Sequence, residues 1–237
     1  MGTCSPIAGA DVICFKTEKE LLRAWRDFVV AVDPDILTGY NIVNFDLVYL
    51  IKRANHLSVP KFTQLGRLTK TSAKIKSSTL KSKQMGARET KEIVIDGRVQ
   101  LDCIQAIQRD YKLSSYSLNA VSAHFLGEQK ENVHHSIITQ LYDGDDNERR
   151  RLAVYCLKDA YLPQRLLDKL MIMINYIEMA RVTGIPIAFI LERGQQIKVV
   201  SQILRKAKDR GYIMPTPIKK ESTLWNGGKV FDPKTGY

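Results

Sequence analysis

The sequence predicts an α/β domain, and the prediction comes from three consecutive features of the chain. An amphipathic helix is predicted over residues 18–32, a short apolar strand over residues 36–40, and a second helix over residues 47–56. A helix that leads into a buried strand and out into another helix is typical of α/β proteins. The length of 237 residues is enough for one large domain, or for one domain with an appendage.

The first helix has a clear start and a clear end. Thr17 is followed three residues later by Glu20, the pattern of a capping box, which predicts the N-terminus of the helix. Pro34 cannot continue the helical hydrogen bonds, so we expect the helix to end just before it. The apolar side chains at helical spacing, which we expect to face the core, are Leu21, Leu22, Trp25, Phe28, Val29 and Val32.

The second helix begins where the apolar strand ends, at Asn44 or Asp46. Asp46 has two interpretations at this position. An aspartate at the start of a helix is commonly an N-cap. A carboxylate at the end of a strand, however, projects from a rigid frame and can bind a metal ion.

The segment of residues 61–91 differs from the rest of the chain in its charge. It contains nine lysines and arginines and one acid, Glu89, with frequent serine and threonine. Hydrophobic periodicity is weak, so we expect a loop or a long hairpin. The elements predicted after it are a strand over residues 91–99 with a turn at Asp96 and Gly97, and helices over residues 101–111 and 117–125.

A long helix is predicted over residues 148–170, capped by the acidic turn at residues 143–147. Pro163 lies inside it and predicts a bend. The remaining predicted features are a break at Gly184 and Pro186, a helix over residues 194–210 and an irregular segment over residues 211–237.

The composition limits the classes of function. The formal net charge is +11, which favours a polyanionic partner such as nucleic acid; a basic surface that only contacts water is the alternative. No run of 18 apolar residues occurs, so we expect no transmembrane helix. The four cysteines form no CxxC pair, which argues against a zinc site or a disulfide framework; we expect small buried residues instead.

Two carboxylates, Asp46 and Asp159, are the candidate chemical groups. Two carboxylates can share a divalent metal ion, which activates water for attack on a phosphate. Tyr155 lies one helical turn before Asp159 and on the same face, where its hydroxyl can hold a water or a phosphate. By itself a tyrosine four residues before an aspartate is a weak motif, and solvated helix residues are the simpler interpretation.

Both aspartates lie within longer sequence phrases. GYNIVNFD at residues 39–46 resembles the second exonuclease motif of family B DNA polymerases, and YCLKDA at residues 155–160 resembles the third. Further phrases that resemble this family are DGRVQLD (96–102), SYSLNAV (115–121), ARVTGIP (180–186) and RGQQIKV (193–199). The resemblance runs from about Cys4 to the end of the sequence.

The resemblance implies an α/β, RNase H-like 3′→5′ exonuclease fold with a mixed central sheet. It places this exonuclease domain at residues 1–175. Residues 176–237 would form a helical linker toward a polymerase palm domain, and WNGGK at residues 225–229 resembles the phrase that joins the two in this family.

The resemblance also implies the chemistry, which is removal of mismatched nucleotides from a primer 3′ end by two-metal hydrolysis. Asp46 and Asp159 would be the metal ligands, with Mg²⁺ as the ion and Mn²⁺ as a substitute. Asp159 would serve the metal that activates water, and Tyr155 would position that water. Asn41 and Phe45 would lie beside the primer end.

The partners that the resemblance implies are primer-template DNA, a single-stranded 3′ end, other polymerase subunits and a sliding clamp. It also implies a location in the nucleus and no binding to a membrane. The basic segment corresponds to a hairpin that helps to part primer from template. Its DNA-binding side chains would contact phosphates without reading sequence. They are Lys74, Lys76, Lys81, Lys83 and Arg88.

One family element is missing from the sequence. The first exonuclease motif, Asp-x-Glu on an early strand, has only Asp146 and Glu148 as a match, and we interpret these as the cap of the long helix. We therefore expect an N-terminally truncated exonuclease domain with little or no activity and an open sheet edge at residues 36–40, relieved by dimerisation or by repacking of the N-terminal residues. The alternatives are a misread gene start and a non-catalytic module that binds single-stranded DNA.

Overall fold

The structure is a computed structural model that describes residues 2–68, 70–82, 86–128 and 135–215, with the single positions 231, 234 and 236. Within these ranges the side chains of residues 77–90, 135 and 192 are not described. The elements in chain order are α1 (Glu18–Val32), β1 (Ile36–Gly39), η1 (Ile42–Asp46), α2 (Leu47–His56), β2 (Lys74–Ser82), β3 (Gly86–Val94), β4 (Val99–Asp102), α3 (Cys103–Asp110), α4 (Leu118–Leu126), α5 (His135–Asp143), α6 (Asp146–Lys169), α7 (Ile172–Thr183), α8 (Ile187–Glu192) and α9 (Gln195–Asp209).

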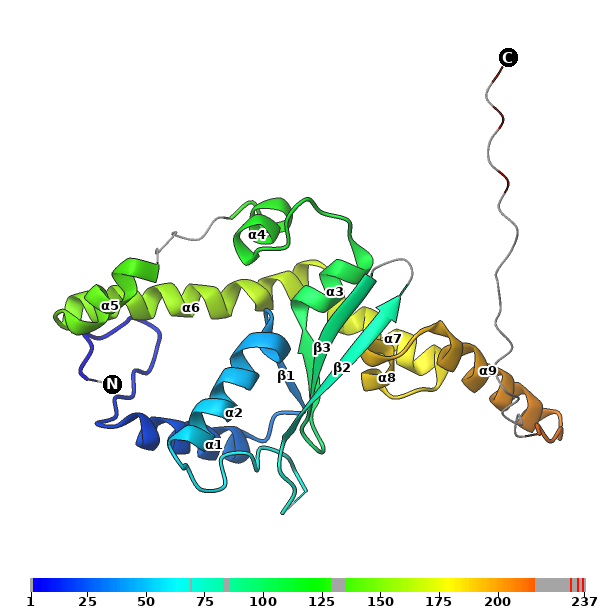
Figure 1. Cartoon of the computed structure of the whole chain (residues 1–237), viewed down its shortest axis with the longest axis horizontal. Helices are drawn as coiled ribbons and strands as arrows, with labels where there is room; N and C mark the ends of the chain where they lie inside the picture. The colour runs from blue at the N-terminus through cyan, green and yellow to red at the C-terminus, as the bar shows by residue number, and fades with distance from the viewer. Residues whose placement is uncertain are drawn as a thin grey trace.

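The long helix α6 spans the molecule and divides it (Figure 1). Helix α4 lies on one side of α6, and β1, α1 and α2 lie on the other, while α7, α8 and α9 continue beyond its C-terminal end. Helix α6 packs against β1, α3, α4, α5 and α7. This arrangement confirms the predicted α/β class.

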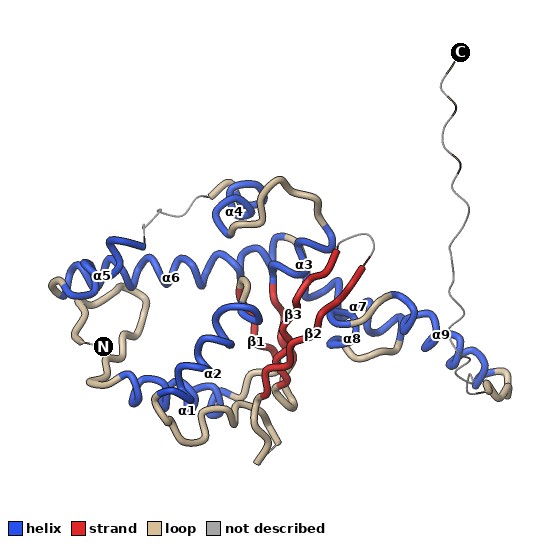
Figure 2. The backbone as a smooth tube through the Cα atoms, viewed as in Figure 1, coloured by secondary structure: helices blue, strands red, loops and turns tan. Residues whose placement is uncertain are grey.

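The strands form two separate pairs. β1 and β4 run parallel, with Ile36 beside Val99 and Gly39 beside Asp102. β2 and β3 form an antiparallel hairpin, drawn as the two long red tubes in Figure 2. No described strand joins the two pairs, so the described residues do not form the expected mixed central sheet.

The open edge that we expected at β1 is present in the part of the chain that the structure describes. β4 is the one described strand paired with β1, so the other edge of β1 has no strand beside it. The N-terminal segment instead runs to the start of α6, where the Ser5 backbone N–H donates to the Asp146 carbonyl at 3.1 Å. Dimerisation through the open edge stays a prediction.

Helix α1 has the predicted bounds, and its capping box is confirmed. The Thr17 hydroxyl accepts from the Glu20 backbone N–H at 3.2 Å, and the Glu20 carboxylate accepts from the Thr17 backbone N–H at 3.1 Å. Two backbone donors that the helix leaves open at its start are thus satisfied locally.

The predicted core face of α1 is only partly right. Leu22 and Val29 are buried, but Leu21, Phe28 and Val32 are exposed. Phe28 is 63% exposed and Val32 is 57% exposed. Apolar spacing predicts an amphipathic helix but not how wide a stripe its neighbours cover, and α2 covers only part of the apolar side.

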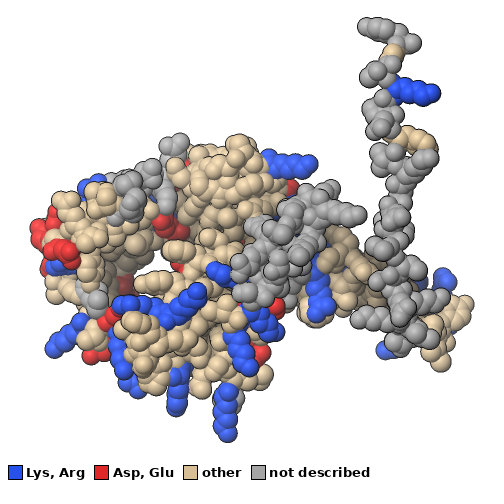
Figure 3. Space-filling model, in the orientation of Figure 1, with Lys and Arg blue, Asp and Glu red and all other residues tan. Residues whose placement is uncertain are grey.

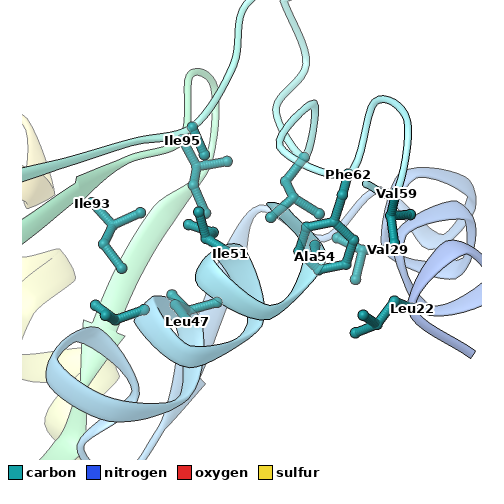
Figure 4. Close-up of a cluster of buried hydrophobic side chains, with 12 residues drawn as sticks. Leu22, Val29, Leu47, Ile51, Ala54, Val59, Phe62, Ile93 and Ile95 are labelled. Carbon is teal, nitrogen blue, oxygen red and sulfur yellow. The ribbon is translucent and has the colours of Figure 1, made fainter. Parts of the chain in front are cut away.

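Two hydrophobic cores hold the fold. The first joins α1, α2 and the base of the hairpin, where Leu47 and Ile51 meet Ile93 and Ile95, and Phe62 covers Ala54 (Figure 4). The second joins β4 and helices α3, α4, α6, α7 and α8. Its fully buried members with at most 1% exposure are Leu101, Cys103, Ile107, Val121, Leu166 and Ile190.

The region of residues 99–110 corrects one prediction. We expected a helix from Leu101, but residues 99–102 form β4 and the helix begins at Cys103. Leu101 pairs with Thr38 in the parallel ladder, and the Asp102 side chain accepts from the Ile104 backbone N–H at 3.3 Å. Pairing with a distant strand and a cap together shift the helix start by two residues.

The helices of the C-terminal half largely follow the predictions. Asp145 and Glu148 form a second capping box at the start of α6. The Asp-x-Glu match therefore belongs to the start of this helix as predicted, although the capping aspartate is Asp145 and Asp146 lies in the first turn. The break at Gly184 and Pro186 separates α7 from α8 as predicted. Helix α5 was not predicted, and the proposed domain boundary at residue 175 falls inside α7 and stays a prediction.

The cysteines are free, as expected from their spacing. The prediction that they are buried is right for Cys103 but wrong for Cys14 and Cys156, which are exposed.

Candidate functional site

The candidate site begins with the loop that connects β1 to α2. Asn41 has a left-handed backbone, with φ 63° and ψ 27°. It is followed by η1, a single π-helical turn closed by the Leu47 backbone N–H, which donates to the Ile42 carbonyl. Isolated π-helical turns occur frequently at functional sites, because they widen the helix and redirect its side chains.

Asp46 lies at the junction of η1 and α2, and its two interpretations can now be compared. Its backbone is right-handed helical, with φ −62° and ψ −55°, and its side chain makes no capping hydrogen bond. Asp46 thus occupies the N-cap position of α2 but does not act as a hydrogen-bonding cap. The Asp46 carboxylate is left available for other contacts.

The buried carboxylate of Asp102 accepts hydrogen bonds from the backbone of this loop. Asp102, at the end of β4, is 2% exposed. One of its oxygens, Oδ1, accepts from the Asn41 backbone N–H at 2.7 Å, and the other, Oδ2, accepts from the Val43 backbone N–H at 3.2 Å. The parallel register puts Gly39 beside Asp102 and so brings the loop within reach.

The environment raises the pKa of both carboxyl groups. For Asp46 the cause is loss of contact with water, partly offset by a hydrogen bond to its own backbone. For Asp102 the main cause is also burial, opposed by the backbone N–H groups of Val43, Asn41 and Ile104, while the charge of Asp46 raises the pKa further.

Tyr155 and Asp159 lie on α6, which packs against β1. Both side chains are half-buried, and Oδ1 of Asp159 is shielded from solvent. In Figure 1 the end of β1 and the start of α2 lie beneath α6. Asp46 thus lies at the end of the turn that follows β1, and Asp159 lies on α6, the helix that packs against β1.

The two predicted neighbours of the primer end differ in exposure. Phe45 is 65% exposed, beside Asp46, and its ring is free to stack on a base. Asn41 is half-buried and is held by its backbone; its side-chain oxygen lies 3.5 Å from Nδ2 of Asn44. Tyr49, one turn into α2, is a second exposed aromatic residue that we did not predict.

Two of the predicted DNA-binding lysines lie on the hairpin with described side chains. Lys74 and Lys76 are exposed on β2, and Ile75 between them packs on the first core. Lys83 lies outside the described residues, and the side chains of Lys81 and Arg88 are not described. In Figure 3 lysines and arginines also stand along the face formed by α1 and α2, so the described basic surface is wider than the hairpin.

One arginine of the basic segment serves the fold instead. Arg67 pairs with Asp33 at 2.8 Å and with Asp35 at 2.7 Å. Its charge is thereby neutralised, which removes it from the set of side chains that can contact phosphates.

The described residues do not complete a metal site by themselves. Mg²⁺ prefers carboxylate oxygens, so Asp46 and Asp159 fit the chemistry of the ion. Among the residues that the structure describes, however, no three His, Cys, Asp or Glu side chains are grouped so that they could hold a metal. No described helix has both the length and the apolar character needed to span a membrane.

Comparison with known proteins decides the family. Residues 2–121 match the family model of the DNA polymerase family B exonuclease domain, and residues 185–237 match that of DNA polymerase family B. The chain belongs to the family B DNA polymerases. The resemblance predicted from the sequence phrases is confirmed, and the first match contains η1, Asp46 and Asp102.

Similar proteins from several organisms share one name, DNA polymerase delta catalytic subunit. The DNA polymerase delta catalytic subunits of Oryza sativa and Arabidopsis thaliana are each 58% identical over 99% of this chain, and that of Drosophila melanogaster is 57% identical over 100%. The chain spans 21% of the rice protein and 22% of the other two.

Sequence reasoning missed Asp102, although it quoted the phrase that contains it. The signal that was available is an aspartate at the end of an apolar strand, the same signal that singled out Asp46. What the sequence did not reveal is that the two strands are parallel neighbours, which brings both aspartates to one edge.

Proposed function

We propose that this chain supplies the 3′→5′ exonuclease site of a DNA polymerase delta catalytic subunit. The observation that carries the proposal is the position of Asp46. It lies without a capping bond on a π-helical turn directly after β1, the strand against which the helix of Tyr155 and Asp159 packs. An RNase H-like fold, proofreading of mismatched primer ends and a nuclear location belong to the same proposal.

The proposed reaction is hydrolysis of the last phosphodiester of a DNA strand. Asp46 and Asp159 would hold Mg²⁺. Two bound ions would lower the pKa of a bound water and stabilise negative charge on the phosphate. Tyr155 would hold the attacking water through its hydroxyl. Phe45 would stack on the terminal base and so hold the strand end in place. Because the described carboxylates are too few for a full coordination shell, we expect the isolated chain to digest DNA slowly.

The hairpin would contact the DNA backbone during this reaction. Lys74 and Lys76 are exposed and separated by an inward-facing residue, so both point away from the first core. Contacts of this kind release counterions and make binding sensitive to salt. Other polymerase delta subunits and a sliding clamp are the further partners in this proposal.

A titration with Mn²⁺, followed by NMR, tests the site. We expect the paramagnetic ion to broaden backbone signals around Asp46 and around Asp159 together. Asp159→Asn should remove the effect at both places, and Asp143→Asn, a change at the distant end of α5, should remove it at neither. Broadening elsewhere, or at one site independently of the other, would contradict the proposal.

Digestion of a labelled, mismatched primer gives the second test. Any shortening should start at the 3′ end, need Mg²⁺ or Mn²⁺, and disappear in Asp159→Ala. Digestion from the 5′ end would sink the proposed activity. Rapid, processive shortening that depends on Asp159 would support the activity but would show that our expectation of slow digestion is wrong.

A further inference from the structure

One buried carboxylate satisfies the starts of two helical segments. The first donors of a helix have no partner within the helix. Asn41 and Val43 occupy the N-cap and second positions of η1, and their backbone N–H groups donate to Asp102 at 2.7 Å and 3.2 Å. Ile104, in the first turn of α3, also donates to Asp102, at 3.3 Å.

A simple helix cap explains only one of these bonds. As the N-cap of α3, Asp102 needs to reach no further than Ile104, and an exposed position would serve. Instead, Asp102 is buried, with only 2% of its surface exposed. Its two shortest hydrogen bonds come from the backbone N–H groups of Asn41 and Val43, which lie 61 and 59 residues earlier in the chain. Burial of a carboxylate is unfavourable unless its oxygens are satisfied, so the contacts to η1 account for its position.

We propose that Asp102 is a positioning residue for the exonuclease site: its carboxylate holds the backbone of Asn41 and Val43 and thereby fixes where η1 presents Asp46. This inference rests on the proposed function. Two details of the loop show why such support is needed. Asn41 has a left-handed backbone, and η1 has π-helical geometry, and neither conformation is favoured locally. A fixed acceptor at their base selects this arrangement.

The experiment compares Asp102→Ala and Asp102→Asn with the natural chain by hydrogen exchange. In Asp102→Ala both loop amides lose their acceptor, so we expect exchange at Asn41 and Val43 to be about tenfold faster or more. Asparagine keeps one acceptor oxygen and replaces the other by an N–H donor. In Asp102→Asn we therefore expect one of the two amides to stay protected.

Val121→Ala is the control for general loss of stability. Val121 is fully buried in the second core, and its truncation removes volume without removing an acceptor for the loop. Exchange at Asn41 and Val43 that is unchanged in Asp102→Ala, or equally fast in Val121→Ala at matched stability, would overturn the proposal.

The Mn²⁺ titration separates positioning from a purely structural role. The apparent affinity for Mn²⁺, measured from the broadening at Asp46, should fall at least about tenfold in Asp102→Ala and stay unchanged in Val121→Ala. Equal broadening in both variants would refute a positioning role. If the natural chain shows no broadening at Asp46, the proposed metal site fails, while the exchange data still decide whether Asp102 holds the loop.

Discussion

The segments that carry Asp46 and Asp159 hold their carboxylates in opposite ways. Asp46 follows a left-handed residue and a π-helical turn, and distant groups on β4 hold that turn in place. Asp159 lies in the middle of a 24-residue α-helix with its own capping box. The first geometry depends on tertiary contacts and the second on local ones, so damage to the sheet should reach Asp46 well before it reaches Asp159.

The β1–β4 pair is clamped at both ends, which gives the first way to test this difference. At one end Asp102 holds the loop, and at the other the buried Arg98 donates to the carbonyls of Leu65 and Pro34 and pairs with Asp33. Arg98→Ala leaves two carbonyls without this donor. At about 1–3 kcal/mol for each, we expect the largest loss of folding free energy among these predictions.

Chemical denaturation measures the loss, and hydrogen exchange locates it. In Arg98→Ala the amides of Asn41 and Val43 should exchange faster, while those around Asp159 should change only with global unfolding. Arg67→Ala is the matched control, because Arg67 shares the partner Asp33 but is partly exposed, and its loss should be much smaller. Equal losses of folding free energy in Arg98→Ala and Arg67→Ala would show that the burial of Arg98 does not matter.

Leu166→Ala probes the helical side of the comparison. Leu166 is fully buried in the second core, and its truncation should cost about 2–5 kcal/mol through lost burial and a cavity. Leu157→Ala makes the same change on the same helix at a side chain that is 44% exposed, and should stay within about 0.5 kcal/mol.

The pattern of exchange sharpens this second test. Because α6 is stabilised along its own length, Leu166→Ala should lower protection across the whole molecule rather than selectively around Asp159. Selective opening of residues 155–159 would contradict the view that this carboxylate is held locally.

These differences explain what the sequence could and could not predict. The start of α1 was predicted accurately because a capping box is a local signal, whereas the predicted start of α6, at residue 148, was two residues late. The sequence pattern predicts a helix from Leu101, inside β4, because the four residues of β4 owe their conformation to β1, whose partner residues are 63 positions earlier. Asp102 was overlooked for the same reason, since its partners are also far away in the sequence.

The site was predictable only where its motifs are continuous. Asp46, Tyr155 and Asp159 were identified from short phrases. Helix α6, which carries the last two, packs against β1, the strand before the turn of Asp46, and their joint role stays a prediction. The π-helical turn was not predicted, because it forms where a left-handed Asn41 meets an acceptor on another strand. Phe45, chosen from the same phrase, is exposed, and its place beside a primer end stays a prediction.

The contribution of Asp33 to folding stability should change with pH in the opposite direction from the contributions of Asp46 and Asp102. Ion pairing with Arg67, and also with Arg98, holds the pKa of Asp33 below its ordinary value of 3.8. A lowered folded-state pKa means that the stabilisation is complete above the unfolded pKa and disappears as the pH falls through the folded pKa. Asp46 and Asp102 have raised pKa values, so they act in the opposite direction and weaken the fold as the pH rises.

Thermal unfolding against pH checks this prediction. Asp33→Asn should lower the melting temperature at pH 7, and the difference from the natural chain should shrink as the pH falls below the ordinary pKa of an aspartate. Asp27→Asn, a change on α1 outside this network, should run parallel to the natural chain. A constant difference down to low pH would mean that the Asp33 charge does not matter.

The smallest expected effect tests whether Asn41 contributes its backbone or its side chain. Its φ of 63° is unfavourable for residues with a Cβ, although asparagine tolerates it better than most. Asn41→Ala should therefore lose about 1 kcal/mol, whereas Asn41→Gly should lose less, because glycine adopts this conformation freely. Both variants keep the backbone N–H that donates to Asp102, so exchange at Val43 should stay slow in both. If Asn41→Gly is as damaging as Asn41→Ala in chemical denaturation, the side chain and its contact with Asn44 would matter more than the backbone. The loop that carries Asp46 would then be held by its own side chains as well as by β4, and the contrast with the locally held Asp159 would be weaker than the structure indicates.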